Sequence, residues 1–363
     1  MAYSDNFVDD LLVLVTDIVS GDMMELSNML YEKSFGESSI ADNHEIITGV
    51  RTGNVVPILK DVPSPDSFPF VDETSCATTE CDITQEFSDF KWDLGLIECR
   101  VPVCLRTFNE NFLRFFNVWR HTQEDEPDLN SAMIQFMTEK FNKNLLLSEW
   151  RATWFGDKAS ASAFYNGIDG FWTLAEAGAG ANSVAITQNA GATFALQAVT
   201  GEEVYNYLIE MYDLASLQPW FDPSSLEYRI TRSMSVKLVA FLNKLGKNAP
   251  MNCECIDPSR AVLSNVYMLE GLTINGIPVV THSEFDDIIN FSAELNGGGG
   301  VNARVNPNRA ILTFRQNLLI GTSETDALNS LDVWYDKTDK KVYIEGSSYV
   351  GSALPMNEYI LAI

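Results

Sequence analysis

The chain has 363 residues, of which 46% are hydrophobic and 11% aromatic, so it can bury sizeable cores and is not disordered throughout. Its 50 acidic residues against 24 Lys and Arg give a formal net charge of −26, which disfavours stable binding to nucleic-acid phosphates or to anionic membranes. The N-terminal residues include neither a basic segment nor an uninterrupted apolar run, so we expect no signal peptide or membrane span, a cytoplasmic origin and reduced cysteines.

Residues 1–49 are predicted to form a thin, acidic N-terminal arm. Apolar residues recur there at helical spacing and predict a short amphipathic helix: Leu11, Leu12, Val15, Ile18 and Val19. A second helix is predicted over roughly 23–33. Because so thin an arm cannot bury its own apolar stripe, we expect it to dock on another part of the structure.

Residues 50–106 are predicted to form an extended β-arm. Four prolines between 57 and 69 stiffen its entry. In the stretch EFSDFKWDLGLIECRVPVCLR the apolar residues change parity beside Gly95, which predicts a bulge or sharp twist in one long strand. Pro102 favours a position at the edge of a sheet. A two-stranded arm of this kind is not stable in isolation.

Residues 107–200 are predicted to contain one long helix, over about 128–155. Asp128 is a suitable N-cap, and Gly156 stands where a C-terminal glycine is expected. Four apolar residues form a stripe along it: Met133, Met137, Phe141 and Leu145. Residues 157–200 are predicted to be loops and short strands.

Residues 201–326 are predicted to form a compact α/β unit, and residues 327–363 a hairpin with its turn at Asp336–Lys340. Thr200 and Glu203 form a capping box that opens a helix to about Leu217. A loop with glycines at 297–300 covers residues 291–308. The other predicted elements are a helix over Ser235–Leu245 and strands at Tyr228–Thr231, Ala261–Leu269, Ile277–Val280, Ile311–Thr313 and Leu318–Gly321.

The clearest candidates for site chemistry are His282, Glu284 and Asp286, which a strand would place on one face. They suggest a metal or acid/base site. The alternative is a buried strand that runs into a polar loop. We favour this alternative, because acidic residues are abundant in this chain and no third or fourth converging ligand is evident. The cysteine spacings do not fit a zinc ribbon, and no nucleophile elbow or P-loop occurs. No cofactor or resident metal is therefore expected, and no enzymatic activity.

The order of the elements resembles that of the major capsid proteins of tailed double-stranded DNA bacteriophages, whose fold also occurs in herpesvirus capsid floors and encapsulins. FKWDLGLIECRVPVCLRTF resembles the returning strand of the family's extended E-loop, and PDLNSAMIQFMTEKFNKNLLLSEWRATWFGD its spine helix. LEGLTINGIPVVTHSEF is similar to a strand of the axial domain. NRAILTFRQNLLIGT and VWYDKTDKKVYIEGSSYVGSALP resemble the last axial strands and the hairpin of the peripheral domain.

The resemblance implies an α+β capsid fold in five parts. These are an N-terminal arm (1–49), an E-loop (50–106), a peripheral domain with the spine helix (107–200), an axial domain (201–326) and a return hairpin of the peripheral domain (327–363). It implies a non-enzymatic subunit of an icosahedral shell, located in the virion and assembled in the bacterial cytoplasm. Candidate subunit-interface residues are Phe87, Phe90 and Trp92 of the β-arm with Leu11 and Val15 of the N-terminal arm.

The implied partners are many copies of the chain itself, as pentamers and hexamers, with separate scaffold, portal and decoration proteins. Packaged DNA would be enclosed without specific binding, and no membrane is involved. Three alternatives remain open: an encapsulin-like compartment, an acidic metal-dependent enzyme that uses the His282 cluster, and a β-rich adhesin or surface-layer subunit, against which the missing signal sequence argues.

Overall fold

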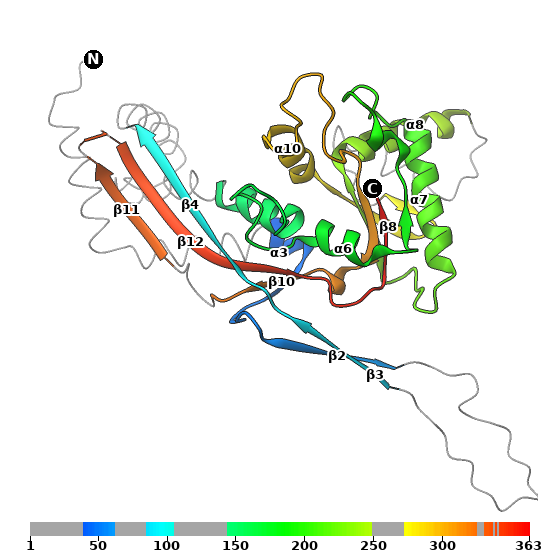
Figure 1. Ribbon diagram of the computed structural model, residues 1–363. Helices are drawn as coiled ribbons and strands as arrows, with labels where there is room; N and C mark the ends of the chain where they lie inside the picture. Colours follow the sequence, from blue (N-terminus) through cyan, green and yellow to red (C-terminus); the bar gives the residue numbers. More distant parts are fainter. Residues whose placement is uncertain are drawn as a thin grey trace, which may run out of the picture.

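The computed structural model describes residues 39–61, 85–104, 144–248, 272–324, 330–336, 338–339 and 341–363. They form a body of sheet and helices, from which a long sheet and a two-stranded arm extend in different directions (Figure 1). The predicted α+β class is therefore confirmed.

The body is built on a six-stranded sheet in the order β5-β13-β9-β6-β8-β7. The strands are β5 (Ser183–Val184), β6 (Leu226–Thr231), β7 (Thr273–Ile274), β8 (Ile277–His282), β9 (Ala310–Phe314) and β13 (Tyr359–Ala362). Strands β6 and β8 run parallel, while β9 is antiparallel to both β6 and β13. The parallel pair explains why residues 277–280 read as a continuous apolar run.

Helices cover both faces of this sheet. On one face lie α6 (Phe171–Ala179), α10 (Ser283–Phe291) and a helical segment at residues 144–155; on the other lie α7 (Gly201–Ser216) and α8 (Arg232–Asn248) (Figure 1). Alternate strand residues face the two cores, as a pleated strand requires: Ile311 packs with the first group of helices and Leu312 with the second.

A second sheet continues from the body. Its strands are β1 (Glu45–Ile47), β10 (Leu319–Thr322), β11 (Ser330–Asp336), β12 (Lys341–Ala353) and β4 (Gly95–Cys104). Strand β12 pairs with β4 along one side and with β10 and β11 along the other. The predicted terminal hairpin is confirmed, since Asp336 pairs with Lys341. Within the described ranges β4 has β12 as its one partner, as Pro102 predicts for an edge strand.

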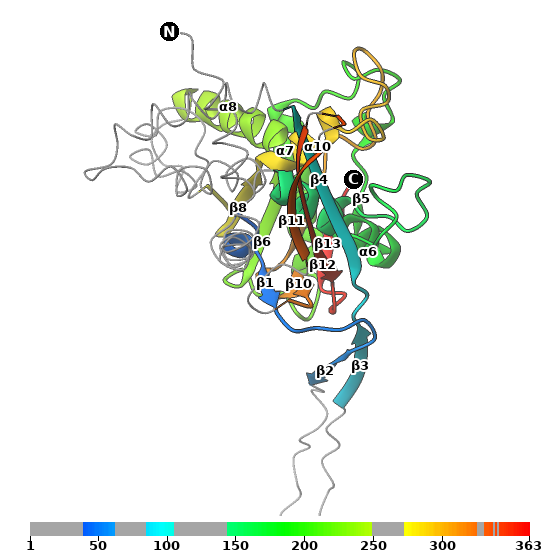
Figure 2. The ribbon, with the colours of Figure 1, turned by 90° about the vertical axis from the view of Figure 1, so that its left-hand side faces the viewer.

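The arm consists of β2 (Val55–Asp61) and β3 (Gln85–Lys91), paired antiparallel from Val55↔Lys91 to Asp61↔Gln85. Figures 1 and 2 both show it pointing away from the body. The predicted single long strand through Gly95 is wrong: β3 ends at Lys91 and β4 begins at Gly95, so the apolar parity changes because residues 92–94 leave one sheet for another.

Several element predictions match the structure closely. The Thr200–Glu203 capping box opens α7, and strands β6 and β8 and helix α8 extend the predicted ranges. The predicted polar loop after β8 is wrong, because residues 283–291 form α10. The long helix is helical over 144–155, while 128–143, the N-terminal helices and the predicted strand at 261–269 lie outside the described residues. Strand β13 lies in the six-stranded sheet, whereas we expected residues 327–363 to stay with the peripheral hairpin.

Candidate assembly surfaces

The β2–β3 arm is the first candidate assembly surface. In the described part of the chain its two strands pair with each other and with no third strand. Two-stranded ribbons bury too little surface to be stable in water, and their free edges can accept further strands. The arm therefore needs a neighbour that the described part of the chain does not supply.

The base of the arm, in contrast, is fixed within the chain. Trp92 packs in a small core with Val50, Leu319 and Ala353. Its backbone N–H donates to Asn54 O (2.9 Å), and its carbonyl accepts from the N–H of Gly53 (2.8 Å). The indole is buried and sits directly over Gly321, where a Cβ atom would lie 2.7 Å from Trp92 Cζ3. The arm thus leaves the body at a fixed place.

This burial changes the prediction made for the arm's aromatic residues. Trp92 is 2% exposed, so it anchors the arm to its own body rather than to another subunit. Phe90 is half-buried against the same core and meets the Trp92 ring edge to face at 5.8 Å. The side chain of Phe87, and all of Leu11 and Val15, lie outside the described residues.

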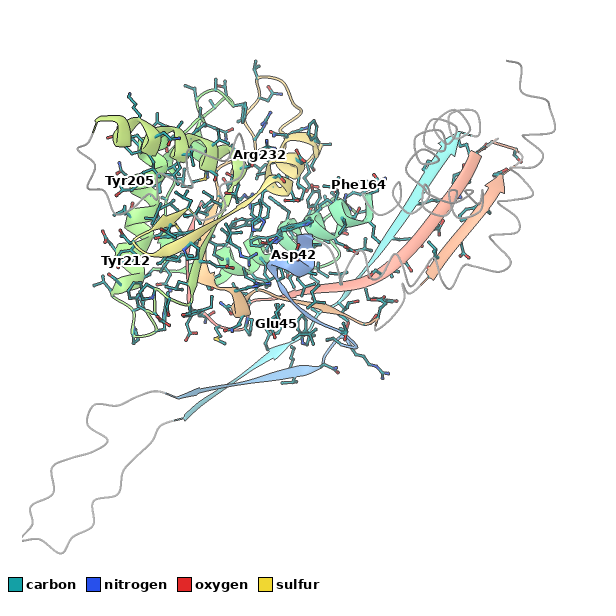
Figure 3. All side chains as sticks on the ribbon, turned by 180° about the vertical axis from the view of Figure 1, so that it is seen from behind. Asp42, Glu45, Phe164, Tyr205, Tyr212 and Arg232 are labelled. Carbon is teal, nitrogen blue, oxygen red and sulfur yellow. The ribbon has the colours of Figure 1, made fainter. Side chains whose placement is uncertain are left out.

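The segment that precedes the arm is also fixed to the body. Helix α3 (Ser39–Asn43) lies against the body and leads into β1, as the labelled Asp42 and Glu45 show in Figure 3. Arg229 of β6 donates to the carbonyl of Asn43 and, through Nε, to Glu227 (2.7 Å). This buried guanidinium joins the chain entering the arm to the centre of the six-stranded sheet.

Beside Arg229 lie two buried histidines that we did not predict as neighbours. His44 Nδ1 lies 3.0 Å from Ile40 O, and His44 Nε2 accepts from Trp154 Nε1 (3.0 Å). The ring of His282 is 6.5 Å from that of His44. Burial, and then the charge of Arg229, hold the pKa of both histidines well below the usual value. Both are therefore neutral parts of an aromatic core.

The three candidate metal ligands do not converge. His282 is the last residue of β8 and lies among aromatic rings, while Asp286 of α10 accepts from the backbone N–H of Ser233 (3.2 Å) and caps the start of α8. Burial raises the pKa of Asp286. Glu284 accepts from the hydroxyl of Ser283 (3.2 Å). Among the described residues, no group of three or more His, Cys, Asp or Glu side chains could hold a metal ion.

A further candidate surface consists of three loops, at residues 157–170, 190–198 and 291–305, which we call the loop surface. Its exposed apolar residues include Phe164 (70% exposed), Leu196, Phe291 (82% exposed) and Val301. The second and third loops are joined by the bond from Phe194 N–H to Val301 O (3.1 Å). The four glycines 297–300 all have positive φ, from 59° to 90°, which explains why this turn is glycine-rich. Phe164 and Phe291 line the same pocket, so these exposed apolar side chains form a candidate contact surface.

The second sheet, of β1, β10, β12, β11 and β4, which we call the outer sheet, carries its own ordered side-chain cluster. The guanidinium of Arg100 on β4 lies over the stacked rings of Trp334 and Tyr343, 4.8 and 4.5 Å from their centroids. Arg100 also pairs with Glu345 at 3.4 Å. These contacts across β4, β12 and β11 hold the three strands together where no helix of the described residues covers them in Figure 1.

No helix in the described ranges is long and apolar enough to cross a membrane.

The arrangement of body, long outer sheet and projecting arm defines the class of fold. No protein-family model matches the sequence, and no curated protein sequence matches it. Solved structures do match. A chain of the satellite phage P4 procapsid, in a structure that includes the size determination (Sid) protein, has a TM-score of 0.51 and 12% identity, over 93% of this chain and 97% of that one.

A chain from Gordonia phage Cozz matches with a TM-score of 0.50 and 13% identity, over 89% of this chain and 84% of that one. The protein thus has the fold of phage capsid proteins. The resemblance found in the sequence is confirmed at the level of the fold.

Proposed function

We propose that this chain is the structural, non-catalytic subunit of an icosahedral phage capsid. Pentamers and hexamers of the chain would enclose packaged double-stranded DNA in the virion. The observation that carries the proposal is the β2–β3 arm, which is fixed at its base by Trp92 but has no third strand in the described structure, within a fold shared with the phage P4 procapsid chain. A closed shell supplies the neighbours that such an arm requires.

The charge and the loop surface support the same proposal. A chain with a net charge of −26 forms a wall to which packaged DNA does not adhere. The exposed Phe164 and Phe291 give the body an apolar contact surface that a neighbouring subunit can cover. We do not propose the alternative enzyme at His282, because Asp286 is used to cap α8.

The remaining partners belong to the same proposal. We infer a separate scaffold, a portal and decoration proteins, with assembly in the bacterial cytoplasm. Because acidic subunits repel one another over about 8–10 Å at physiological salt, added salt or Mg²⁺ is expected to promote assembly.

The test is the mass of the purified full-length protein by light scattering, with negative-stain images of the same fractions at low salt, at high salt and with Mg²⁺. Closed shells, or five- and six-fold rings of the 40.4 kDa chain, are the expected result. The proposal would be contradicted if the protein stays a monomer under all three conditions and if replacing residues 56–90 with a short Gly-Ser linker leaves this monomeric state unchanged.

A pair of matched variants tests the loop surface. Phe291→Ser is expected to reduce assembly, whereas Leu217→Ser, at the equally exposed C-cap of α7 (80% exposed), is expected to leave it unchanged. Circular dichroism of both variants checks that the fold is retained. Equal assembly of the two variants would exclude the loop surface as a subunit contact.

A further inference from the structure

Glu149 is a buried carboxyl group without a visible partner. It lies in the helical segment 144–155, is 0% exposed, and neither carboxylate oxygen has a hydrogen-bond partner in the described structure. The helix around it is firmly attached: Thr153 Oγ1 donates to Glu149 O (2.7 Å), and Ser352 of β12 donates to Thr153 O (2.7 Å). Glu149 therefore lies where this helix packs against the outer sheet.

The charged group that acts on Glu149 is Glu324, which follows β10. Glu324 is 8% exposed and is surrounded by donors: the backbone N–H of Tyr349 (2.8 Å), the hydroxyl of Ser348 (3.4 Å) and the hydroxyl of Thr322. These donors satisfy the oxygens of the Glu324 carboxylate. The two residues form what we call the Glu149–Glu324 pair.

Two carboxyl groups in one buried site would repel each other if both were charged. Either a proton on one of them or a cation between them would relieve this repulsion. The hydroxyls of Thr322 and Ser348 and the backbone N–H of Tyr349 donate to Glu324, so its charge is compensated without an ion. No third acidic or histidine ligand completes a metal site among the described residues. A buried carboxyl group without donors is neutral, because the ionised form would lose its hydration without compensation. Burial, and then the charge of Glu324, accordingly raise the pKa of Glu149 well above its usual value.

Other charged groups nearby are already engaged elsewhere. Arg151 of the same helix lies over the rings of Phe164 and Tyr165. His44 and His282 contact the adjacent Trp150 and are neutral. Within the described ranges, Glu324 is thus the charge that Glu149 meets.

We propose that Glu149 is a neutral carboxylic acid that makes the packing of helix 144–155 on the outer sheet sensitive to pH. Loss of its proton places two negative charges in one buried site and weakens the contact between helix and sheet. This inference concerns the folded chain itself and does not depend on the proposed function.

The test compares urea unfolding of the full-length protein with that of Glu149→Gln, over about pH 5 to 9, above the usual pKa of a glutamate. Because the folded state holds a proton that the unfolded state releases, wild-type stability falls as pH rises towards the pKa of folded Glu149. The ratio of the two folding constants, variant over wild type, is expected to increase by up to about tenfold per pH unit. Glu210→Gln, at an exposed position of α7, is the control and is expected to give a constant ratio. A constant ratio for Glu149→Gln as well would overturn the proposal.

Two further variants keep the test decisive. Glu149→Met has an apolar side chain of similar length. If Glu149→Gln does not fold, the ratio of the Glu149→Met and wild-type folding constants is expected to rise with pH in the same way. Glu324→Gln removes the neighbouring charge. The stability of this variant should therefore stop falling with rising pH at a lower pH than that of the wild type. No change in that pH would show that the two carboxyl groups do not interact.

The cation alternative gives a separate result. If Ca²⁺ or Mg²⁺ at neutral pH raises the Tm of the wild type but not that of Glu149→Gln, the pair holds a cation and the neutral-acid proposal is wrong. If neither ion changes the difference in Tm between the two proteins, the proton is the occupant.

Discussion

Adding one methyl group at Gly321 should loosen the base of the arm. A Cβ atom there would lie 2.7 and 2.8 Å from Trp92 Cζ3 and Cε3, well inside ordinary contact distance. Gly321 cannot move away, since β10 is held between β1 and β12. The indole must therefore shift, and we expect Gly321→Ala to lower the free energy of unfolding by about 1–3 kcal/mol.

The size of the Trp92 contribution sets the upper limit of this effect. A buried indole removes roughly 200 Å² of surface from water, which at about 25 cal/mol per Å² corresponds to about 5 kcal/mol. Complete loss of the contact, as in Trp92→Ala, should therefore cost about 3–5 kcal/mol. Gly321→Ala should cost less, because the ring can move without leaving the core.

A double-mutant cycle tests the contact itself. Trp92→Phe removes the ring atoms that the new methyl group would overlap, so Gly321→Ala should cost at least about 1 kcal/mol less in that background. Urea unfolding followed by circular dichroism measures all four proteins. Gly167→Ala, where a Cβ atom meets nothing within 4 Å, is the control and should show no such coupling. Effects of Gly321→Ala and Trp92→Phe that add within about 0.3–0.5 kcal/mol would refute the reasoning.

Three other predictions follow from buried or capping groups. Arg229→Met leaves Glu227 and the Asn43 carbonyl without their donor and should cost about 3–5 kcal/mol in urea unfolding; a cost below about 1 kcal/mol would argue against the connection. Burial lowers the pKa of His282, so the neutral ring contributes its full stability above about pH 6.5. The free energy of unfolding should therefore fall as pH drops below that value, and it should fall less steeply in His282→Gln. Thr200→Ala removes the acceptor for Glu203 N–H and should cost about 1 kcal/mol in thermal unfolding, and unchanged stability would mean that the capping box contributes nothing.

Local signals predicted many of the elements, but the prediction of loops and short strands over 157–200 is wrong at Phe171–Ala179, which forms α6. The capping box of Thr200 and Glu203 works through residues three positions apart, so the sequence alone was sufficient to place the start of α7. Pro102 lacks a backbone donor, which restricts it to an edge wherever the strand lies. The order of such elements also carried the resemblance to the capsid fold.

Helix α10 shows a local signal that we weighed wrongly. Ser283 and the acidic Glu284 and Asp286 stand at the first turn, and Phe285 and Ile289 follow at helical spacing. These are features of a helix start, but the alternation of His282, Glu284 and Asp286 matched a strand equally well over so short a stretch.

The contacts of the candidate surfaces depend on residues far apart in the chain and could not be predicted in this way. Trp92 looked like an exposed anchor because nothing near it in sequence shows that Gly321 leaves space for its ring. Arg229 and His44 are 185 positions apart, and they meet because α3 packs against the sheet. Glu149 was one acid among 50, and only its burial distinguishes it.

The position of β13 has a consequence for the order in which the molecule is made. This strand lies between β5 and β9, and all four of its residues are buried, yet it follows every other strand of the sheet in the chain. Until residues 359–362 have been synthesised, β5 and β9 lack their common neighbour, and the cores on both sides of the sheet remain open. Completion of the body therefore waits for the end of this stretch, so both faces of the six-stranded sheet become fully ordered only on a chain translated through Ala362.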